Sequence, residues 1–156
     1  MNFNKINFNK MNKDDLVKEL EKHYNTNGAD CVTVTHSRDC AECFSTLLKY
    51  SKKECFMVLY IDGANSVIGT EILSKKGFNS ESVNERDLFR NAIKYNCASI
   101  VIGHNKKGKV CDPTAEDMKL TQKLFNTSEL VGIEILDHVI LFDEGHYSFH
   151  GNGKLR

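Results

Sequence analysis

The chain alternates between short apolar runs and longer stretches in which apolar residues recur every three or four positions. Short β-branched runs are typical of buried strands, and the wider spacing is typical of helices with one apolar face. The runs predict strands at residues 31–35, 55–61, 67–73, 99–102, 133–142 and 147–149. The wider spacing predicts helices at residues 14–24, 37–50, 85–95 and 115 to about 130. Because helices alternate with strands and hairpins, the pattern predicts an α/β fold with a mixed central sheet flanked by helices.

Two of the predicted helices carry clear start signals. Asn84 is followed three residues later by Asp87, and Thr114 by Asp117. A side-chain oxygen at the first of these positions can accept the free N–H groups of the first turn, and Thr114 with Asp117 predicts a capping box. The apolar spacing predicts these inward-facing residues: Leu88, Phe89, Ala92 and Ile93 in one helix, and Met118, Thr121, Leu124 and Phe125 in the other.

Candidate chemistry is concentrated in the segment that joins the strand at 99–102 to the last helix. We expect the strand to end at Gly103, where it is followed by His104, a loop rich in Lys and Gly, and Pro113, the only proline. A polar loop that leaves the carboxyl end of a buried strand and enters a helix is where α/β proteins tend to place binding and catalytic groups.

Length and charge exclude several classes of protein. The chain of 156 residues is long enough to bury a core without disulfides or a structural metal. Lys and Arg together number 21, as do Asp and Glu, so no net charge attracts nucleic acid or an anionic membrane. No apolar run approaches the ~18 residues of a membrane span, and no apolar signal core is seen near the N-terminus. We therefore expect a cytoplasmic protein that neither enters a membrane nor binds nucleic acid as its main activity.

Composition divides the chain into three parts. Residues 1–30 are a polar arm, which begins with a repeated Asn-Phe-Asn-Lys, and a short helix; residues 31–150 are the folded domain; residues 151–156 are a polar tail. Six cysteines are scattered along the chain, at positions 31, 40, 43, 55, 97 and 111. Cys40 and Cys43 have the spacing of a metal or redox pair, but no second pair accompanies them, and both fit the apolar stripe of a helix. We therefore interpret them as reduced thiols in the core.

The run from Glu54 to Phe149 resembles the RadC-like branch of the JAB/MPN metallopeptidase domain, also called the JAMM domain. The similar segments, in order, are VLYIDGANSVIG, RDLFRNAIKYNCASIVIGHN, DPTAEDMKLTQKL, LVGIEILDHVIL and GHYSF. The resemblance implies a cytidine-deaminase-like α/β architecture and a zinc site that hydrolyses peptide or isopeptide bonds. It also implies membership of a family associated by name with DNA repair.

The metal motif of that family is His-x-His, seven residues, Ser, two residues and Asp, with a Glu well upstream. By resemblance, the first His falls on His104, the Asp on Asp117, the Glu on Glu54 and the Ser on Thr114. In the family, the two His and the Asp hold zinc, the Glu accepts the proton of the bound water, and the hydroxyl helps to stabilise the oxyanion.

The second His of the motif is Lys106 in this chain. An ammonium group has no lone pair for a metal, and its charge repels a cation, so we expect zinc to be weakly bound or absent. Lys106 would then serve as a tethered cation between the carboxylates of Glu54 and Asp117; the alternative is that it points to solvent. A Cys111 thiolate is a second candidate ligand, whereas His138, His146 and His150 are interpreted as structural.

Three functions remain open, and the sequence does not decide whether the chain is an enzyme. The first is a non-catalytic or weakly active relative that binds a peptide or protein partner. The second is an active zinc-dependent hydrolase with an altered metal site. The third is a nucleic-acid-associated protein, which the balanced charge disfavours. The oligomeric state is not predicted.

Overall fold

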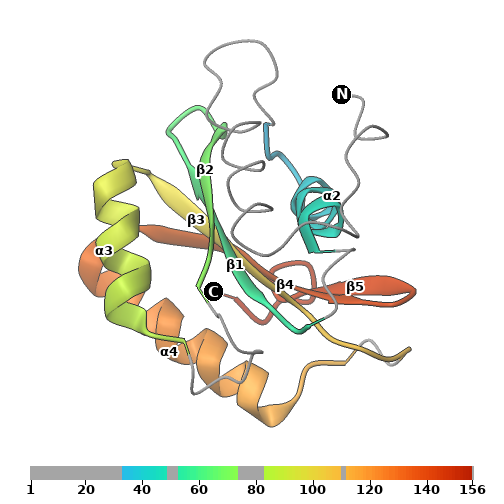
Figure 1. Ribbon diagram of the computed structural model, residues 1–156. Coiled ribbons are helices and arrows are strands. Elements are labelled where there is room, and N and C mark those ends of the chain that lie inside the picture. The colour runs from blue at the N-terminus through green and yellow to red at the C-terminus, as the bar shows by residue number, and fades with distance from the viewer. Residues whose placement is uncertain (1–32, 49–52, 74–82, 110–111, 156) are drawn as a thin grey trace.

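The protein is described by a computed structural model that places residues 33–48, 53–73, 83–109 and 112–155. A five-stranded sheet in the order β2-β1-β3-β4-β5 lies between α2 on one face and the pair α3 and α4 on the other (Figure 1). The helices are α2 (Ser37–Leu48), α3 (Glu85–Tyr95) and α4 (Ala115–Val131). The strands are β1 (Phe56–Ile61), β2 (Val67–Ile72), β3 (Ser99–Asn105), β4 (Glu134–Phe142) and β5 (Gly145–Ser148). The predicted helix at 14–24 lies outside the described residues.

The sheet is mixed, as the sequence predicts. β1 pairs antiparallel with both β2 and β3, and β4 forms an antiparallel hairpin with β5. Between them, β3 and β4 run parallel, and α4 is the crossover that connects the two. A crossover helix packs on the face of the sheet that it bridges. The beginning of α4 therefore lies close to the end of β3, which the chain leaves to enter this helix.

β3 is longer than the sequence predicts. It continues past Gly103 to Asn105 because β1 and β4 both pair with it there, His104 standing opposite Phe56 on one side and Ile140 on the other. Gly103 is required inside the strand by close packing, since a Cβ atom at this position would lie 2.8 Å from ring atoms of Phe44. His104 is therefore a fully buried residue of a central strand, and the prediction that this strand ends at Gly103 is wrong.

Both predicted helix starts are confirmed. The side chain of Asn84 accepts the backbone N–H groups of Arg86 and Asp87, and Thr114 forms a complete capping box with Asp117. The predicted inward faces are correct except at Ile93, which is 63% exposed, and Met118, which is 37% exposed. Each of these two residues lies at the edge of the apolar stripe, beyond the area that the sheet covers.

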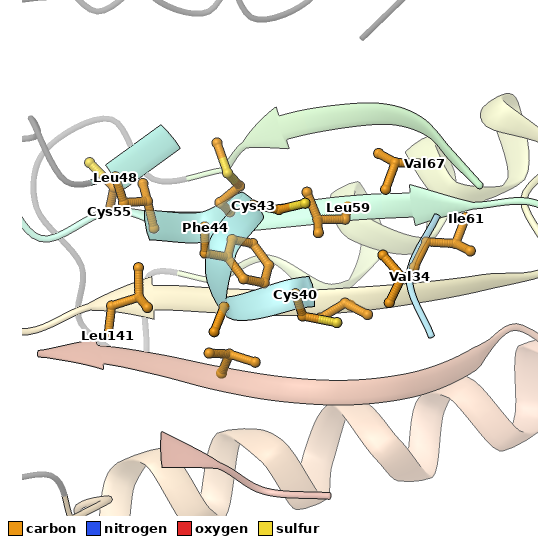
Figure 2. Packing of buried hydrophobic residues seen from close by; sticks show 14 residues of the cluster. Val34, Cys40, Cys43, Phe44, Leu48, Cys55, Leu59, Ile61, Val67 and Leu141 are labelled. Atoms are coloured by element: carbon orange, nitrogen blue, oxygen red, sulfur yellow. The ribbon is translucent and has the colours of Figure 1, made fainter. Parts of the chain in front are cut away.

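The core against α2 contains the cysteines of the predicted metal-like spacing. Cys40 and Cys43 are free thiols, buried around Phe44 between the helix and the sheet (Figure 2). Burial raises the pKa of the Cys40 thiol to about 12, so this thiol is neither a ready nucleophile nor a ready metal ligand. The interpretation of Cys40 and Cys43 as core residues is confirmed, while Cys31 and Cys111 lie outside the described residues.

Residues 151–155 are anchored to the sheet. Lys154 donates its backbone N–H to the carbonyl of Phe149, and Leu155 packs against Ile140 and Phe149. The segment after Gly151 was predicted to be a polar tail, but it closes over a small apolar cluster through Leu155. Among the described residues, no helix is both long and apolar enough to cross a membrane.

Candidate functional site

The end of β3 and the beginning of α4 bring four of the predicted site residues together. Side chains alternate along a strand, so His104 and Lys106 both leave β3 on the side that α4 covers. The Lys106 ammonium forms an ion pair with the carboxylate of Asp117 and lies 3.3 Å from the hydroxyl of Thr114. The His104 Nε2 atom lies 3.3 Å from Asp117 Oδ1. These contacts place Lys106 inward, not toward solvent.

The carboxylate of Asp117 is the centre of this cluster. Its Oδ2 atom accepts the backbone N–H of Thr114 at 2.7 Å and the Thr114 hydroxyl at 2.8 Å, in addition to Lys106. Burial by itself would raise the pKa of Asp117, but the hydrogen bonds from His104, Lys106 and Thr114 together hold it well below its usual range. Asp117 is therefore an anion at neutral pH, stabilised by donors from β3 and from its own helix cap.

His104 is buried between the sheet and α4, where its ring is stacked on Phe56. Burial lowers the pKa of His104; Asp117 and Glu54 oppose this effect and Lys106 adds to it. The imidazole is therefore neutral at pH 7 and carries one N–H. Since Nε2 faces an ionised carboxylate, the proton is best placed on Nε2, which leaves Nδ1 as the acceptor.

A second histidine, His138 on β4, completes a hydrogen-bonded chain behind His104. Its Nε2 atom lies 3.0 Å from His104 Nδ1, and its Nδ1 atom lies 2.6 Å from the hydroxyl of Thr121 on α4. The Thr121 hydroxyl also lies 2.7 Å from the carbonyl of Asp117. The series of hydrogen bonds therefore starts at Asp117 on α4 and ends on the same helix. With the proton of His104 on Nε2, His138 donates from its own Nε2 atom to Nδ1 of His104. The single hydroxyl proton of Thr121 is then shared between His138 Nδ1 and the carbonyl of Asp117.

The contact between His138 and His104 is not predicted by the sequence. His138 is structural in the sense that it is fully buried and stacked on Phe149, but it also orients the ring of His104. Two signals could have identified this role. His138 belongs to a strand predicted to pair within the same sheet, and Thr121 lies one helical turn after Asp117.

Glu54 lies just before β1, two residues from the Phe56 that pairs with His104. By strand alternation its side chain leaves on the same side as Phe56 and His104, and its charge acts to raise the pKa of His104. Glu54 therefore acts on His104 through its charge, on the side of the sheet where the cluster lies. The two other candidate histidines lie elsewhere: His150 donates its backbone N–H to Asp137, and His146 is exposed on β5.

A cleft of about 420 Å³ opens at the end of β3, on the face of the sheet that α2 covers and thus opposite to the cluster. Polar and apolar groups line it together, among them Asn105, Lys107, Leu141 and His146, and Lys106 borders it. Such a mixture suits an extended peptide, whose backbone and side chains need both kinds of contact. Two of the three loop lysines already have acidic partners, Lys106 in Asp117 and Lys109 in Glu144.

The donor set limits what metal the cluster can hold. A catalytic zinc site takes three protein ligands and leaves a fourth position for water. Throughout the part of the chain that the structure describes, no three His, Cys, Asp or Glu side chains lie close enough to share one ion. His104 and Asp117 supply two donor groups, and the third position is filled by the ammonium of Lys106, which repels a cation.

Comparison with known proteins agrees with this geometry. The model of the RadC-like JAB domain family matches residues 34–154. A UPF0758 protein of Desulforudis audaxviator is 38% identical over 96 residues, which are 62% of this chain and 42% of that protein. A UPF0758 protein of Methanosarcina acetivorans is 34% identical over 109 residues, 70% of this chain and 48% of that protein. In Pseudoalteromonas translucida, the UPF0758 protein PSHAa2643 is 33% identical over 140 residues, 89% of this chain and 62% of that protein.

This chain spans about half the length of the first two of these relatives. The family match includes every element of the described fold and all five residues of the predicted site. The order of the sheet and the β3–α4 junction are consistent with a JAB domain. The chain therefore belongs to the RadC-like JAB domain family.

Proposed function

We propose that this chain is a cytoplasmic JAB domain with a degenerate metal site, a non-catalytic or weakly active relative of the zinc metallopeptidases that binds a peptide or protein partner. The observation that carries the proposal is the ion pair between Lys106 and Asp117. Lys106 stands at the position of the second histidine of the family motif, and its ammonium takes the carboxylate that would otherwise ligate zinc.

The electrostatics of the cluster support this proposal. Glu54 and Asp117 are two acidic groups beside one site, and two carboxylates that share a site repel each other unless a cation lies between or near them. In a zinc-loaded member of the family, the metal would supply that positive charge and would activate a water molecule. Here Lys106 supplies the charge from within the chain, but an ammonium group cannot activate water as zinc does.

The peptide or protein partner is inferred from the cleft at the end of β3, which shares Lys106 with the cluster but opens on the α2 face of the sheet. The cleft beside Lys106 combines Asn105, Lys107 and His146 with the apolar side chains of Leu141 and Phe142. A domain that has lost hydrolysis but kept this cleft would retain recognition of an extended chain.

The second candidate function is an active zinc-dependent hydrolase. It is favoured by the convergence of His104, Thr114 and Asp117, with Glu54 beside them. In that case a third ligand is required, and the Cys111 thiolate is the candidate within the loop, although it lies outside the described residues. Removal of this thiol therefore separates the two functions.

Zinc binding tests the proposal directly. Elemental analysis of protein purified without added metal or chelator, followed by calorimetric titration with zinc, should show little zinc in the parent. Lys106→His rebuilds the His-x-His motif and should give clear zinc affinity. Lys107→His is the matched control, since it adds an imidazole one position away on the exposed loop and should gain little.

Two further variants decide between the functions. Lys106→Met removes the ammonium without adding a ligand, so it should remain a poor zinc binder. Near-stoichiometric zinc in the parent, or parent affinity as tight as that of Lys106→His, would refute the degenerate site. If Cys111→Ser then abolished this affinity, the hydrolase with a thiolate ligand would replace the first proposal.

A further inference from the structure

The backbone on both sides of Glu54 is hydrogen-bonded to a side chain on the opposite face of the sheet, that of Asn105. The pairing of β1 with β3 ends at Phe56 and His104, so Glu54 lies just beyond the last paired residue of β1. Asn105, the last residue of β3, reaches across to this segment. Its Oδ1 atom accepts the backbone N–H of Cys55 at 2.7 Å, and its Nδ2 group donates to the carbonyl of Lys53 at 3.1 Å.

These two hydrogen bonds bracket Glu54. One is made to the residue before it and the other to the residue after it, so a single carboxamide holds the backbone on both sides. A carboxamide offers one acceptor and two donors in one plane, and it can therefore take the place of the peptide group of a neighbouring strand. Asp at this position would lack the donor, and Ser would be too short to reach both groups.

Because side chains alternate between the two faces of a sheet, fixing the backbone of residues 53–55 also fixes the face to which the Glu54 side chain points. The alternation continues into the residues that flank β1 and β3. Asn105 and Cys55 face the side of α2, whereas Glu54, His104 and Lys106 face the side of α4. Continuing the register from Phe56 and His104 by two residues sets Glu54 opposite Lys106. A slip of one residue would turn the Glu54 side chain away from the site.

We propose that Asn105 is a positioning residue, which holds the Glu54 carboxylate beside His104 and Lys106 by clamping the backbone of residues 53–55. This inference rests on the proposed function, because it concerns the acidic group that Lys106 balances in the same site. We therefore predict that the effect of the Glu54 charge on the His104 ring depends on Asn105, although Asn105 contacts neither the carboxylate nor the ring.

The experiment is a double-mutant comparison on the full chain by NMR at one fixed pH. The ring chemical shifts of His104 are measured with and without Glu54→Gln, in the parent and in Asn105→Ala. The change caused by Glu54→Gln should be clear in the parent and lost in Asn105→Ala. Hydrogen exchange at the Cys55 amide should also quicken about tenfold in Asn105→Ala, because one protecting hydrogen bond is removed.

Asn91→Ala is the matched control, since Asn91 is also a half-buried asparagine, but it donates to the carboxylate of Glu71 at 2.7 Å and makes no contact with residues 53–55 among its described hydrogen bonds. In this variant the response of His104 to Glu54→Gln should equal that of the parent. An equal response in Asn105→Ala would overturn the proposal, as would a parent in which Glu54→Gln leaves the His104 ring unaffected. A merely structural role of Asn105 would change exchange at Cys55 and leave the response of His104 intact.

A second variant covers the case in which Asn105→Ala does not fold. Asn105→Asp keeps the shape and the acceptor for the Cys55 N–H but loses the donor to Lys53, so the response of His104 should be smaller than in the parent. A response equal to the parent's would overturn the proposal. Zinc is absent from every sample, so a failure here leaves the zinc comparison of Lys106→His untouched, and the converse also holds.

Discussion

Lys106 and Asp117 form an ion pair in which the side chain of Asp117 is 2% exposed and that of Lys106 is 18% exposed. The carboxylate is thus almost removed from water, while the ammonium remains at the rim of the site. A buried anion needs hydrogen-bond donors, and Lys106 is one of those that Asp117 has. Since Lys106 follows β3 and Asp117 lies in the first turn of α4, their ion pair connects these two elements.

Removal of the cation should destabilise the fold. Lys106→Met leaves Asp117 buried with only His104 and Thr114 as donors, and we expect a loss of about 2 kcal/mol in the free energy of unfolding. Urea denaturation of the parent and the variant measures this loss. Lys107→Met is the control, because the neighbouring side chain is exposed and its loss should cost no more than about 0.5 kcal/mol. Equal midpoints for the two variants would contradict a stabilising ion pair.

The helix cap makes a separate contribution. Thr114→Ala removes the hydroxyl that accepts the backbone N–H of Asp117 at 3.3 Å, and it should cost about 1 kcal/mol of stability. Thr114→Ser should recover most of this loss, since it keeps the oxygen. As a control, Thr46→Ala lies inside α2, where the hydroxyl donates back to the carbonyl of Glu42 at 2.9 Å, and it should not destabilise. Chemical denaturation compares the three variants.

Stability should fall as the pH is lowered below neutrality. Burial lowers the pKa of both His104 and His138, so the folded protein keeps these rings neutral while the unfolded chain protonates them near pH 6.5. The unfolded state then binds more protons, and the free energy of unfolding should decrease from about pH 7.5 to pH 5, by up to about 1.4 kcal/mol per pH unit for each histidine.

Urea titrations at several pH values measure this slope. His138→Gln should make it shallower, because one buried histidine no longer takes up a proton on unfolding. His146→Gln should leave the slope unchanged, since His146 is exposed on β5. A parent whose stability is constant over this range would show that the two rings are not held neutral.

The contact between β3 and α2 should tolerate no added methyl group. A Cβ atom at Gly103 would meet the Phe44 ring at 2.8 Å, so we expect Gly103→Ala to cost about 1–3 kcal/mol. Phe44→Leu in the same chain should recover part of this loss by making room. Gly63→Ala is the control, because no atom of the described residues lies within 4 Å of a Cβ atom there. A thermal melt of each variant tests the prediction.

Most of the fold could be predicted from the sequence because the signals are local. The apolar run at 56–61 and the periodic stripes of α3 and α4 report burial on one face, and the caps at Asn84 and Thr114 need only a side chain and the next three residues. The family resemblance added the candidate site, since it assigned Glu54, His104, Thr114 and Asp117 to motif positions. It gave no information on the distances between these residues.

Only the tertiary structure decided how the site residues are buried, where their side chains point and which groups they contact. β3 extends through His104 because strands on both sides pair with it, and pairing partners are remote in sequence. The inward direction of Lys106 depends on where α4 presents Asp117, and the contact of His104 with His138 spans 34 residues. Hydrogen bonds and ion pairs of this kind depend on atomic distances across elements, which the sequential order of residues does not contain.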